Sequence, residues 1–497
     1  MFDNLVLGAV TAFSVHNLLY AFIGVLLGNI IGVLPGIGAL AAISMLLPAT
    51  YGLDPIGALL MLAGLYYGTS FGGATTSILL NLPGTPSHAI VCVEGNPLAR
   101  QGKGGLAIFM AMLSSFIGVV VGILVMTFFS PLLTDLALVF GPAEYFSLML
   151  LGLIAASTLT TSSPLKGIIS VIMGLLLGVI GIDVNSGLAR LNFGFHELQD
   201  GISLVALAMG LFGISDVLAH AGHLGDGAII ANGNVGGRNM RPDWKILKQS
   251  GGSIGRGSII GSVLGILPGA GGSMASFMSY AVEKRVSRTP QRYGTGMMQG
   301  VSGPEAANSS AAITAFIPTL TLGIPGDAIM ALMLGALMIH NITPGPLLMN
   351  EHPELFWGLL ASFGIGNLML LILNIPLIKV WVKLLSVPYR LTFPVILFLI
   401  AIGVYSANNN LFDVSIVLII GVFGYLAVSL GYQPAPLLLG FVLGPMLEEN
   451  FRRALVLSRG DLTVFFTETI SGWIMAFTIL ILLVVGIKQV RRIKLSR

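Results

Sequence analysis

Long apolar segments, most of them roughly 20 residues, dominate the chain and run continuously rather than alternating apolar with polar positions. A helix needs about that length to cross the hydrocarbon core of a bilayer, whereas the strands of a membrane barrel alternate. The pattern therefore predicts an all-α polytopic membrane protein with about 10–12 membrane helices. Glycine and proline interrupt the apolar sequence at 34–38, 82–86, 267–272 and 324–327, so broken helices and re-entrant hairpins are expected.

The chain also repeats itself. Three motif pairs follow in the same order: GVLPGIG at 32–38 with GILPGAG at 265–271, LPG at 82–84 with IPG at 324–326, and the apolar runs that start at Phe146 and Phe393. The separation within successive pairs grows slowly and in one direction, as two copies with small insertions produce. We expect a first membrane repeat over 1–231 and a second over 232–497, with a basic cytoplasmic connector at about 220–256.

Basic residues orient the two copies, because Lys and Arg gather on the cytoplasmic side of membrane proteins. Nine of them fall between Asn232 and Arg292, on both flanks of the apolar stretch 257–282. Two basic flanks on one side predict a re-entrant hairpin with its tip at 267–272 and arms of about 12 residues. The matching stretch at 18–50 has no basic flank, which predicts a hairpin that enters from outside.

Paired loops indicate that the repeat is inverted. The loop at 94–104 is basic while its counterpart at 340–354 is acidic, and a second pair of loops agrees. One feature disagrees, since inversion alone leaves the C-terminus outside, yet five basic residues follow from Lys488 onward. Either an extra membrane crossing lies near 434–447, or the tail departs from the rule.

Composition narrows the classes of function. Hydrophobic residues make up 55% of the chain and charged residues 9%, with a mean hydropathy of +0.93. Soluble domains carry about 25% charged residues, so a soluble enzyme, a nucleic-acid-binding protein and a disordered scaffold are excluded. The single cysteine, Cys92, forms no internal disulfide. The chain has neither an HExxH run nor a Walker A run, and we expect neither an enzyme nor a resident cofactor.

A polar run of small residues precedes a Pro-Gly break in each half, over 70–85 and 303–327. Half-helix N-termini at such breaks offer N–H groups to an anion, and unwound carbonyl groups can coordinate a cation. Hydroxyls and amides with few charges suit a carboxylate and Na+. The expected substrate-binding residues are Gly36, Gly38, Gly72, Gly73, Thr75, Thr76, Ser77, Gly269, Gly271, Gly272, Asn308, Ser309 and Ser310.

Ionisable residues inside a membrane are costly enough to be functional candidates. The expected coupling-ion residues, for Na+ or H+, are Asn81, Thr85, Glu305 and Asp327. Thr85 stands opposite Asp327 in the repeat, so the two half-sites are chemically unequal. Small residues also pack membrane helices, and any one run alone is more typical of packing; the pairing with a break in both halves favours a site. His88 and His340 follow the breaks and are candidates for proton transfer, although helix-end histidines bonded to a carbonyl group are commoner.

Along nearly its whole length the chain resembles the large, TctA-type membrane subunit of tripartite tricarboxylate transporters. The resemblance rests on GVLPGIG at 32–38, YYGTSFGG at 66–73, LNLPG at 80–84, PEAAN at 304–308, LGIPG at 322–326 and PGP at 344–346. It implies a three-part system in a bacterial inner membrane: this permease, a small four-helix membrane subunit and a periplasmic substrate-binding protein. It further implies uptake of a tricarboxylate or related organic acid, driven by an ion gradient rather than ATP. Which carboxylate, and whether Na+ or H+, stay open.

A membrane channel, or a structural subunit without ion coupling, is the alternative. Re-entrant loops also line channel filters. The two-fold repeat favours a carrier, because each half can supply one gate.

Overall fold

The computed structural model describes residues 1–34, 38–158, 163–183, 186–220, 235, 240–269, 271–385, 387 and 389–495. Helices form nearly all of the regular structure in these residues, which confirms the all-α prediction. The exception is one short antiparallel pair, β1 (Gly181–Ile182) with β2 (Ala189–Arg190). Six helical segments in the described chain are long and apolar enough to cross a membrane: Val15–Val33, Pro55–Leu80, Pro86–Ala137, Pro353–Leu384, Leu411–Ser429 and Thr469–Ile487.

Ten α-helices precede the connector. They are α1 (Phe2–Ala12), α2 (Val15–Val33), α3 (Ala39–Leu46), α4 (Pro55–Leu80), α5 (Ala89–Leu98), α6 (Gly104–Ala137), α7 (Pro142–Thr158), α8 (Pro164–Gly178), α9 (Leu204–Ala208) and α10 (Ser215–His220). Short turns η1 (Pro48–Thr50), η2 (Pro86–His88), η3 (Ala99–Lys103), η4 (His196–Asp200) and η5 (Met209–Ile214) link several of them. These counts cover the part of the chain that the structure describes.

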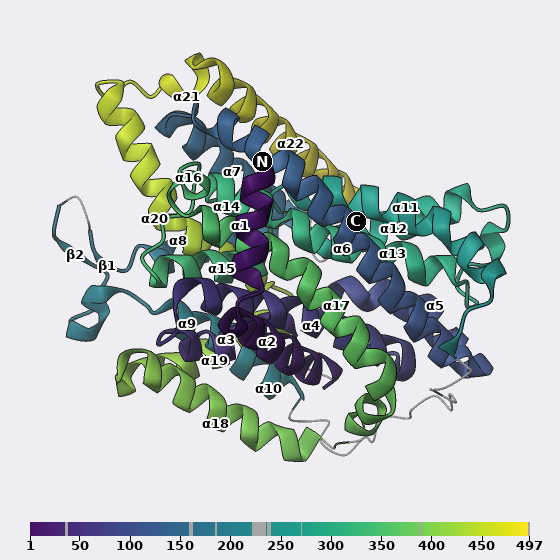
Figure 1. Ribbon diagram of the computed structural model, residues 1–497. Coiled ribbons are helices and arrows are strands. Elements are labelled where there is room, and N and C mark those ends of the chain that lie inside the picture. Colours follow the sequence, from purple (N-terminus) through teal and green to yellow (C-terminus); the bar gives the residue numbers. More distant parts are fainter. Residues whose placement is uncertain are drawn as a thin grey trace.

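The second half has a similar order of helices. They are α11 (Trp244–Ile266), α12 (Gly271–Val286), α13 (Gln299–Thr314), α14 (Phe316–Leu322), α15 (Ala328–Ile339), α16 (Leu348–Glu351), α17 (Pro353–Leu384), α18 (Tyr389–Asn408), α19 (Leu411–Ser429), α20 (Pro434–Leu457), α21 (Val464–Thr467) and α22 (Thr469–Leu495), with the turn η8 (Pro290–Arg292) after α12. Helices α11, α12 and α13 pack together at one end of the molecule, and β1 and β2 lie at the opposite end (Figure 1).

Local chemistry explains where the central helices begin and end. The side chain of Asp54 accepts a hydrogen bond from Gly57 N at the start of α4, and Pro55 occupies the first helical position. Helix α4 ends at Asn81, whose backbone is left-handed (φ 58°), and α14 ends at Gly323 (φ 68°). Asn and Gly are the residues that adopt this conformation most readily, so both helices stop just before a Pro-Gly break.

Two stripes of glycine recur at matching positions. Gly24, Gly28 and Gly32 of α2 lie against the backbone of α4 at Met61, Leu65 and Thr69; Gly257, Gly261 and Gly265 of α11 lie against α13 at Gly303, Ala307 and Ala311. A Cβ at any of these glycines would overlap the facing backbone. Close helix contact through small residues is the usual packing mode in membranes. Both contacts keep the register of the sequence repeat, while the boundary at residue 231 and the inverted orientation stay predictions.

The hairpin around the second tip is longer than the apolar pattern indicates. Helices α11 and α12 pack against each other on either side of Leu267, Pro268 and Gly269, as predicted, but α11 has 23 residues and α12 has 16. An ion pair joins the two helices at the border of the apolar stretch 257–282: Arg256 Nε lies 2.7 Å from Glu283 Oε1. Arg256 is near the middle of α11, and this helix continues beyond the ion pair to Trp244.

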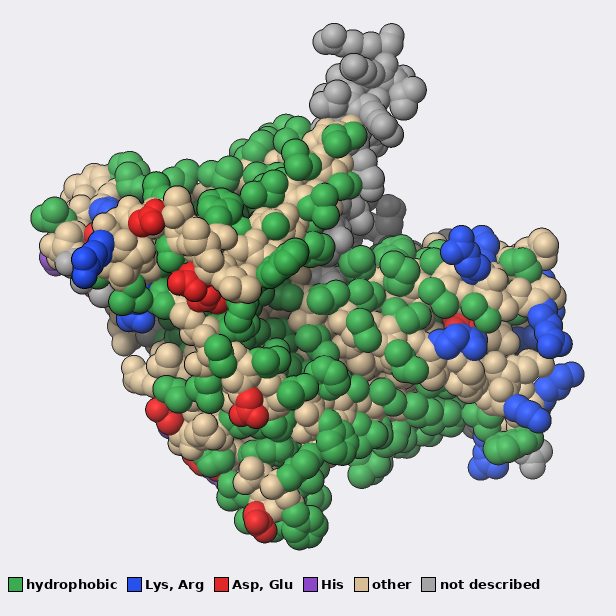
Figure 2. All heavy atoms as spheres, turned by 90° about the horizontal axis from the view of Figure 1, so that it is seen from above, with side chains coloured by type: hydrophobic (Ala, Val, Ile, Leu, Met, Phe, Trp, Pro, Cys, Tyr) green, Lys and Arg blue, Asp and Glu red, His purple; other side chains and the backbone are tan. Residues whose placement is uncertain are grey.

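Two long helices follow residue 433, namely α20 and α22. Of the two, α22 contains a described segment long and apolar enough to cross a membrane, Thr469–Ile487, and the extra crossing near 434–447 stays a prediction. Hydrophobic side chains cover most of the face seen in Figure 2, while Lys and Arg gather at the end where α11 and α12 lie. Only 11% of the apolar window of α22 and 22% of that of α19 is buried. Such faces fit contact with lipid.

Candidate functional site

Helices α4 and α13 form the buried centre of the molecule. Every residue of α13 from Gly300 to Thr314 is buried, and so is nearly all of α4. Their Gly, Ala, Ser and Thr residues allow α2, α6 and α11 to pack closely around them. The two polar runs of the sequence therefore lie on neighbouring central helices, one from each half. Asn308 Nδ2 of α13 donates a hydrogen bond to Ser70 Oγ of α4 (3.1 Å).

The tip of the second hairpin is attached to the second break. Gly269 N donates to Gly326 O (2.7 Å), and Gly269 has a left-handed backbone (φ 83°) packed against Ala156 of α7. A Cβ added to Gly271 would lie 3.4 Å from Asp327 Cβ, and one added to Gly272 would overlap the side-chain oxygen of Asn308. The start of α12 thus lies between Asp327 and Asn308 and leaves little space for a side chain.

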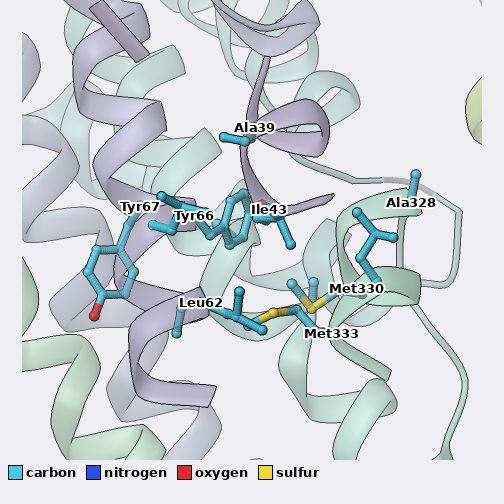
Figure 3. Close-up of a cluster of buried hydrophobic side chains, with 14 of the residues drawn as sticks. Ala39, Ile43, Leu62, Tyr66, Tyr67, Ala328, Met330 and Met333 are labelled. Carbon is cyan, nitrogen blue, oxygen red and sulfur yellow. The ribbon is translucent and has the colours of Figure 1, made fainter. Parts of the chain in front are cut away.

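Asp327 caps the helix that follows the second break. Its Oδ1 accepts a hydrogen bond from Met330 N (2.9 Å) at the start of α15. Because the start of α12 is also close, the carboxylate lies near two helix N-termini, where negative charge is favoured. The residue after Asp327, Ala328, belongs to a buried apolar cluster from both halves that includes Ile43 of α3, Tyr66 of α4, and Met330 and Met333 of α15 (Figure 3).

The first break brings His88 to Glu305. His88 Nε2 lies 3.6 Å from Glu305 Oε1, and both side chains are 1% exposed. Ser115 Oγ of α6 donates to Glu305 Oε2 (3.0 Å). The other ring nitrogen, Nδ1, lies 2.7 Å from Thr85 Oγ1. Thr85 Oγ1 in turn lies 2.7 Å from Ser87 Oγ. Gly73 supplies the space, since a Cβ there would lie 3.2 Å from His88 Nδ1.

The structure brings many of the predicted residues together. Gly73, Thr85 and Glu305 surround His88, while Gly269, Gly271, Gly272, Asn308 and Asp327 meet at the second tip. Gly38 lies at the start of α3, and a Cβ there would be 4.0 Å from Gly84 O. Gly36 lies outside the described residues.

Other predicted residues have neighbours typical of helix packing. Thr76 Oγ1 donates to Val33 O of α2 (3.0 Å), and Ser310 Oγ donates to Ser258 O of α11 (2.9 Å). Ser77 Oγ donates to Gly73 O (2.8 Å) and accepts from Gly84 N (3.3 Å). The remaining members of the predicted set are Gly72 against α2, Thr75 and Ser309 buried in the helices, and Asn81 exposed at the end of α4. Their roles in binding stay predictions.

Glu94 is the most deeply buried of the described carboxylates that are absent from the sequence-based set. Glu94 of α5 is 0% exposed and accepts hydrogen bonds from Tyr280 Oη (2.8 Å) and from the backbone N of Gly294, Gly296 and Met297 (2.5–2.8 Å). Four donors satisfy the charge, so Glu94 joins the first half to the loop after α12. In the sequence, Glu94 is an acidic residue within an otherwise apolar segment. Because it lies close to the basic residues at 100–103, the sequence predicts a loop here and does not predict that Glu94 is buried.

A family model matches residues 18–439, and its description is the tripartite tricarboxylate transporter TctA family. The chain belongs to this family. The match spans both hairpins, both breaks and the His88–Glu305 contact, and the resemblance predicted from the motifs is thereby confirmed. Membership makes this TctA-family chain a component of a three-part transporter.

Two relatives come from Agrobacterium vitis. An uncharacterized 52.8 kDa protein in the TAR-I ttuC′ 3′ region is 46% identical over 479 residues, which cover 96% of this TctA-family chain and 94% of that protein. An uncharacterized protein in the TAR-II ttuC′ 3′ region is 52% identical over 231 residues, or 46% of this chain and 96% of that protein.

Proposed function

We propose that this chain is the large permease subunit of a binding-protein-dependent transporter and that it carries out secondary active uptake of a carboxylate. The substrate is a tricarboxylate or a related organic acid. The coupling ion is Na+ or H+, and no ATP is consumed. A periplasmic binding protein delivers the substrate, a small four-helix membrane subunit completes the complex, and the assembly lies in a bacterial inner membrane.

The observation that carries this proposal is that the polar elements of the two halves converge. The start of α12, the second break and the polar run of α13 meet within hydrogen-bond or contact distance. Gly38 and the first break approach the same pair of central helices from the other half. Helix N-termini with Gly at the point of approach can replace the water around a carboxylate without a buried Arg. That is the arrangement expected of a carrier with broken helices.

We assign two kinds of role to the residues. Gly38, Gly271, Gly272 and Asn308 contact the substrate through backbone N–H groups and the side-chain amide, and Gly269, whose N–H is bonded to Gly326 O, holds the tip in place. Asp327, Glu305, Thr85 and Asn81 serve the coupling ion. Asp327 is partly exposed, and its carboxylate lies near the N-termini of α12 and α15, where negative charge is favoured, which suits an attracted cation.

The test is transport in proteoliposomes that contain this chain and the small subunit, with purified binding protein outside. The binding protein is first screened against labelled citrate, dicarboxylates and aromatic acids to choose the substrate. We expect saturable uptake that follows an imposed ion gradient, needs no ATP and shows counterflow. Non-saturable flux without counterflow would indicate a channel and contradict the proposal.

A matched pair of variants places the site. Gly271→Val should abolish uptake, because the position has a left-handed backbone (φ 58°) and faces Asp327. Gly251→Val on α11 is the control, since nothing lies within 4 Å of a Cβ there. Substrate binding to the binding protein is measured alongside and should not change. Normal uptake by Gly271→Val would move the site elsewhere.

A further inference from the structure

We propose that His88 and Glu305 together form a proton-binding site and that the ion coupled to transport is therefore H+. This inference rests on the proposed uptake function and deepens it by choosing between Na+ and H+. The proposed site joins His88, which follows the first break, to Glu305 of α13, the central helix of the second half.

The geometry shows two buried polar atoms facing each other without a partner. His88 Nε2 and Glu305 Oε1 are both without a hydrogen bond, and they are 3.6 Å apart. That separation is too long for a hydrogen bond, which needs about 2.7–3.2 Å. An unpaired buried donor or acceptor costs about 1–3 kcal/mol. A proton held between the two atoms, with a small approach of the side chains, removes both penalties at once.

The atoms present favour a proton over a metal cation. The facing pair consists of one imidazole nitrogen and one carboxylate oxygen, and the second carboxylate oxygen already accepts from Ser115. Alkali and other hard cations are held by sets of several oxygen ligands. An imidazole and a carboxylate, in contrast, are the two side chains that most readily exchange a proton near neutral pH.

The proton balance links this site to a change of shape. With neutral His88 and ionised Glu305 the pair carries one negative charge, and one proton taken up makes it neutral, whichever side chain holds it. An uncompensated carboxylate is expensive in a dry interior. Loss of the proton therefore favours a state in which water reaches Glu305, so the first break moves away from α13. Binding of the proton favours the closed contact that the structure contains.

A short chain of hydrogen-bonding groups connects the pair to the surface. The imidazole offers Nε2 to Glu305 and Nδ1 to Thr85 Oγ1, and Thr85 is partly exposed. A proton accepted at Nδ1 can leave from Nε2, which is how an imidazole relays protons. Leu82, in the same break, is 45% exposed, so solvent or a partner reaches this end of the chain.

Two other carboxylates on the helices next to the pair, Glu94 and Glu283, are held by partners of their own. The titratable or charged residues on the packed helices, in the described part of the chain, are Tyr66 and Tyr67 on α4, Cys92 and Glu94 on α5, Asp135 on α6, Lys245, Lys248 and Arg256 on α11, and Tyr280, Glu283, Lys284 and Arg285 on α12. Glu94 has four donors, and Glu283 pairs with Arg256. Cys92 is the member of this group whose thiol interacts electrostatically with Glu305.

The first experiment compares two gradients in proteoliposomes with the binding protein and small subunit present. Wild type should accumulate substrate when the interior is alkaline and no Na+ gradient is imposed. Glu305→Gln should lose about tenfold or more of this accumulation while it retains counterflow, since exchange needs no net proton movement. His88→Gln should move the pH at which exchange is half-maximal. His16→Gln is the matched control, because His16 also contacts a carboxylate, Asp54, but at 63% exposure.

A second measurement needs no transport. Infrared difference spectra of the purified chain during a pH titration should contain a protonated-carboxyl or imidazolium signal that both Glu305→Gln and His88→Gln remove and His16→Gln keeps. Spectra in which both variants retain all wild-type signals would overturn the proton site. Accumulation that follows only a Na+ gradient would overturn the proton site as well, but it would leave the proposed uptake function intact. Absence of any saturable uptake would contradict the uptake function itself. In that case the infrared spectra would still decide whether the proton site exists.

Discussion

The two Pro-Gly breaks share a sequence pattern and differ in their surroundings. Leu82 of the first break is 45% exposed, whereas Ile324 at the matching position of the second break is 0% exposed. Both breaks follow a left-handed residue, Asn81 or Gly323. The repeated local geometry therefore does not decide how open a break is.

Tertiary contacts account for the difference. The second break is joined to the hairpin tip by the Gly269 N to Gly326 O bond, and Gly345 N donates to Leu320 O just before it. The first break leads instead into the short turn η2, where Thr85 bonds with Ser87 and His88. The second break is thus buried and the first is exposed in the same structure.

The largest expected difference concerns the glycines of the two breaks. A Cβ on Gly84 would overlap the backbone of Gly73, while one on Gly326 would lie 3.3 Å from Ala315 Cβ. We expect Gly84→Ala to destabilise the protein by roughly 3 kcal/mol and Gly326→Ala by about 1 kcal/mol or less. Thermal unfolding of the purified proteins measures both.

The control for this pair is Gly255→Ala on α11, where a Cβ meets nothing within 4 Å. It should gain up to about 1 kcal/mol from helix propensity. Equal losses in Gly84→Ala and Gly326→Ala would show that the two breaks are packed alike and would remove the asymmetry.

Chemical labelling can measure the difference in exposure between positions 82 and 324. In a Cys92→Ala background, Leu82→Cys should react with a polar maleimide about tenfold faster than Ile324→Cys, because reaction requires access to the thiol. Addition of substrate-loaded binding protein should bring the two rates closer, if the complex alternates between the two ends. Rapid labelling at 324 in the free protein would contradict the burial of the second break.

The smallest effect separates the charge of Asp327 from its role as a helix cap. Asp327→Ala should cost about 1 kcal/mol of stability, since it removes the bond to Met330 N. Asp327→Asn keeps a capping oxygen and should stay within a few tenths of a kcal/mol of wild type. If Asp327→Asn also takes up substrate normally, Asp327 is a helix cap alone and takes no part in ion coupling.

The positions of the breaks and of the buried carboxylates could be predicted from the chain, because their signals are local. Pro-Gly breaks inside apolar sequence, the tip at 267–269 and the buried carboxylates Glu305 and Asp327 all follow from residue type and spacing. The glycine stripes at Gly24–Gly32 and Gly257–Gly265 were not among the predictions, although their spacing of four residues is a sequence signal for close helix packing. The packing roles of Thr76 and Ser310 could not be predicted, since a hydroxyl that bonds to a neighbouring helix looks the same in sequence as one that faces a ligand.

The sequence by itself determined the membrane class, the family, the doubled motifs and the places where helices break, because hydrophobicity and the conformational limits of Gly and Pro act over a few residues. Only the tertiary structure decided that His88 meets Glu305, that Glu94 is satisfied by a distant loop and that the second break is buried while the first is exposed. Each of these contacts joins segments far apart in the chain, and its strength depends on burial and on the donors that packing brings within reach.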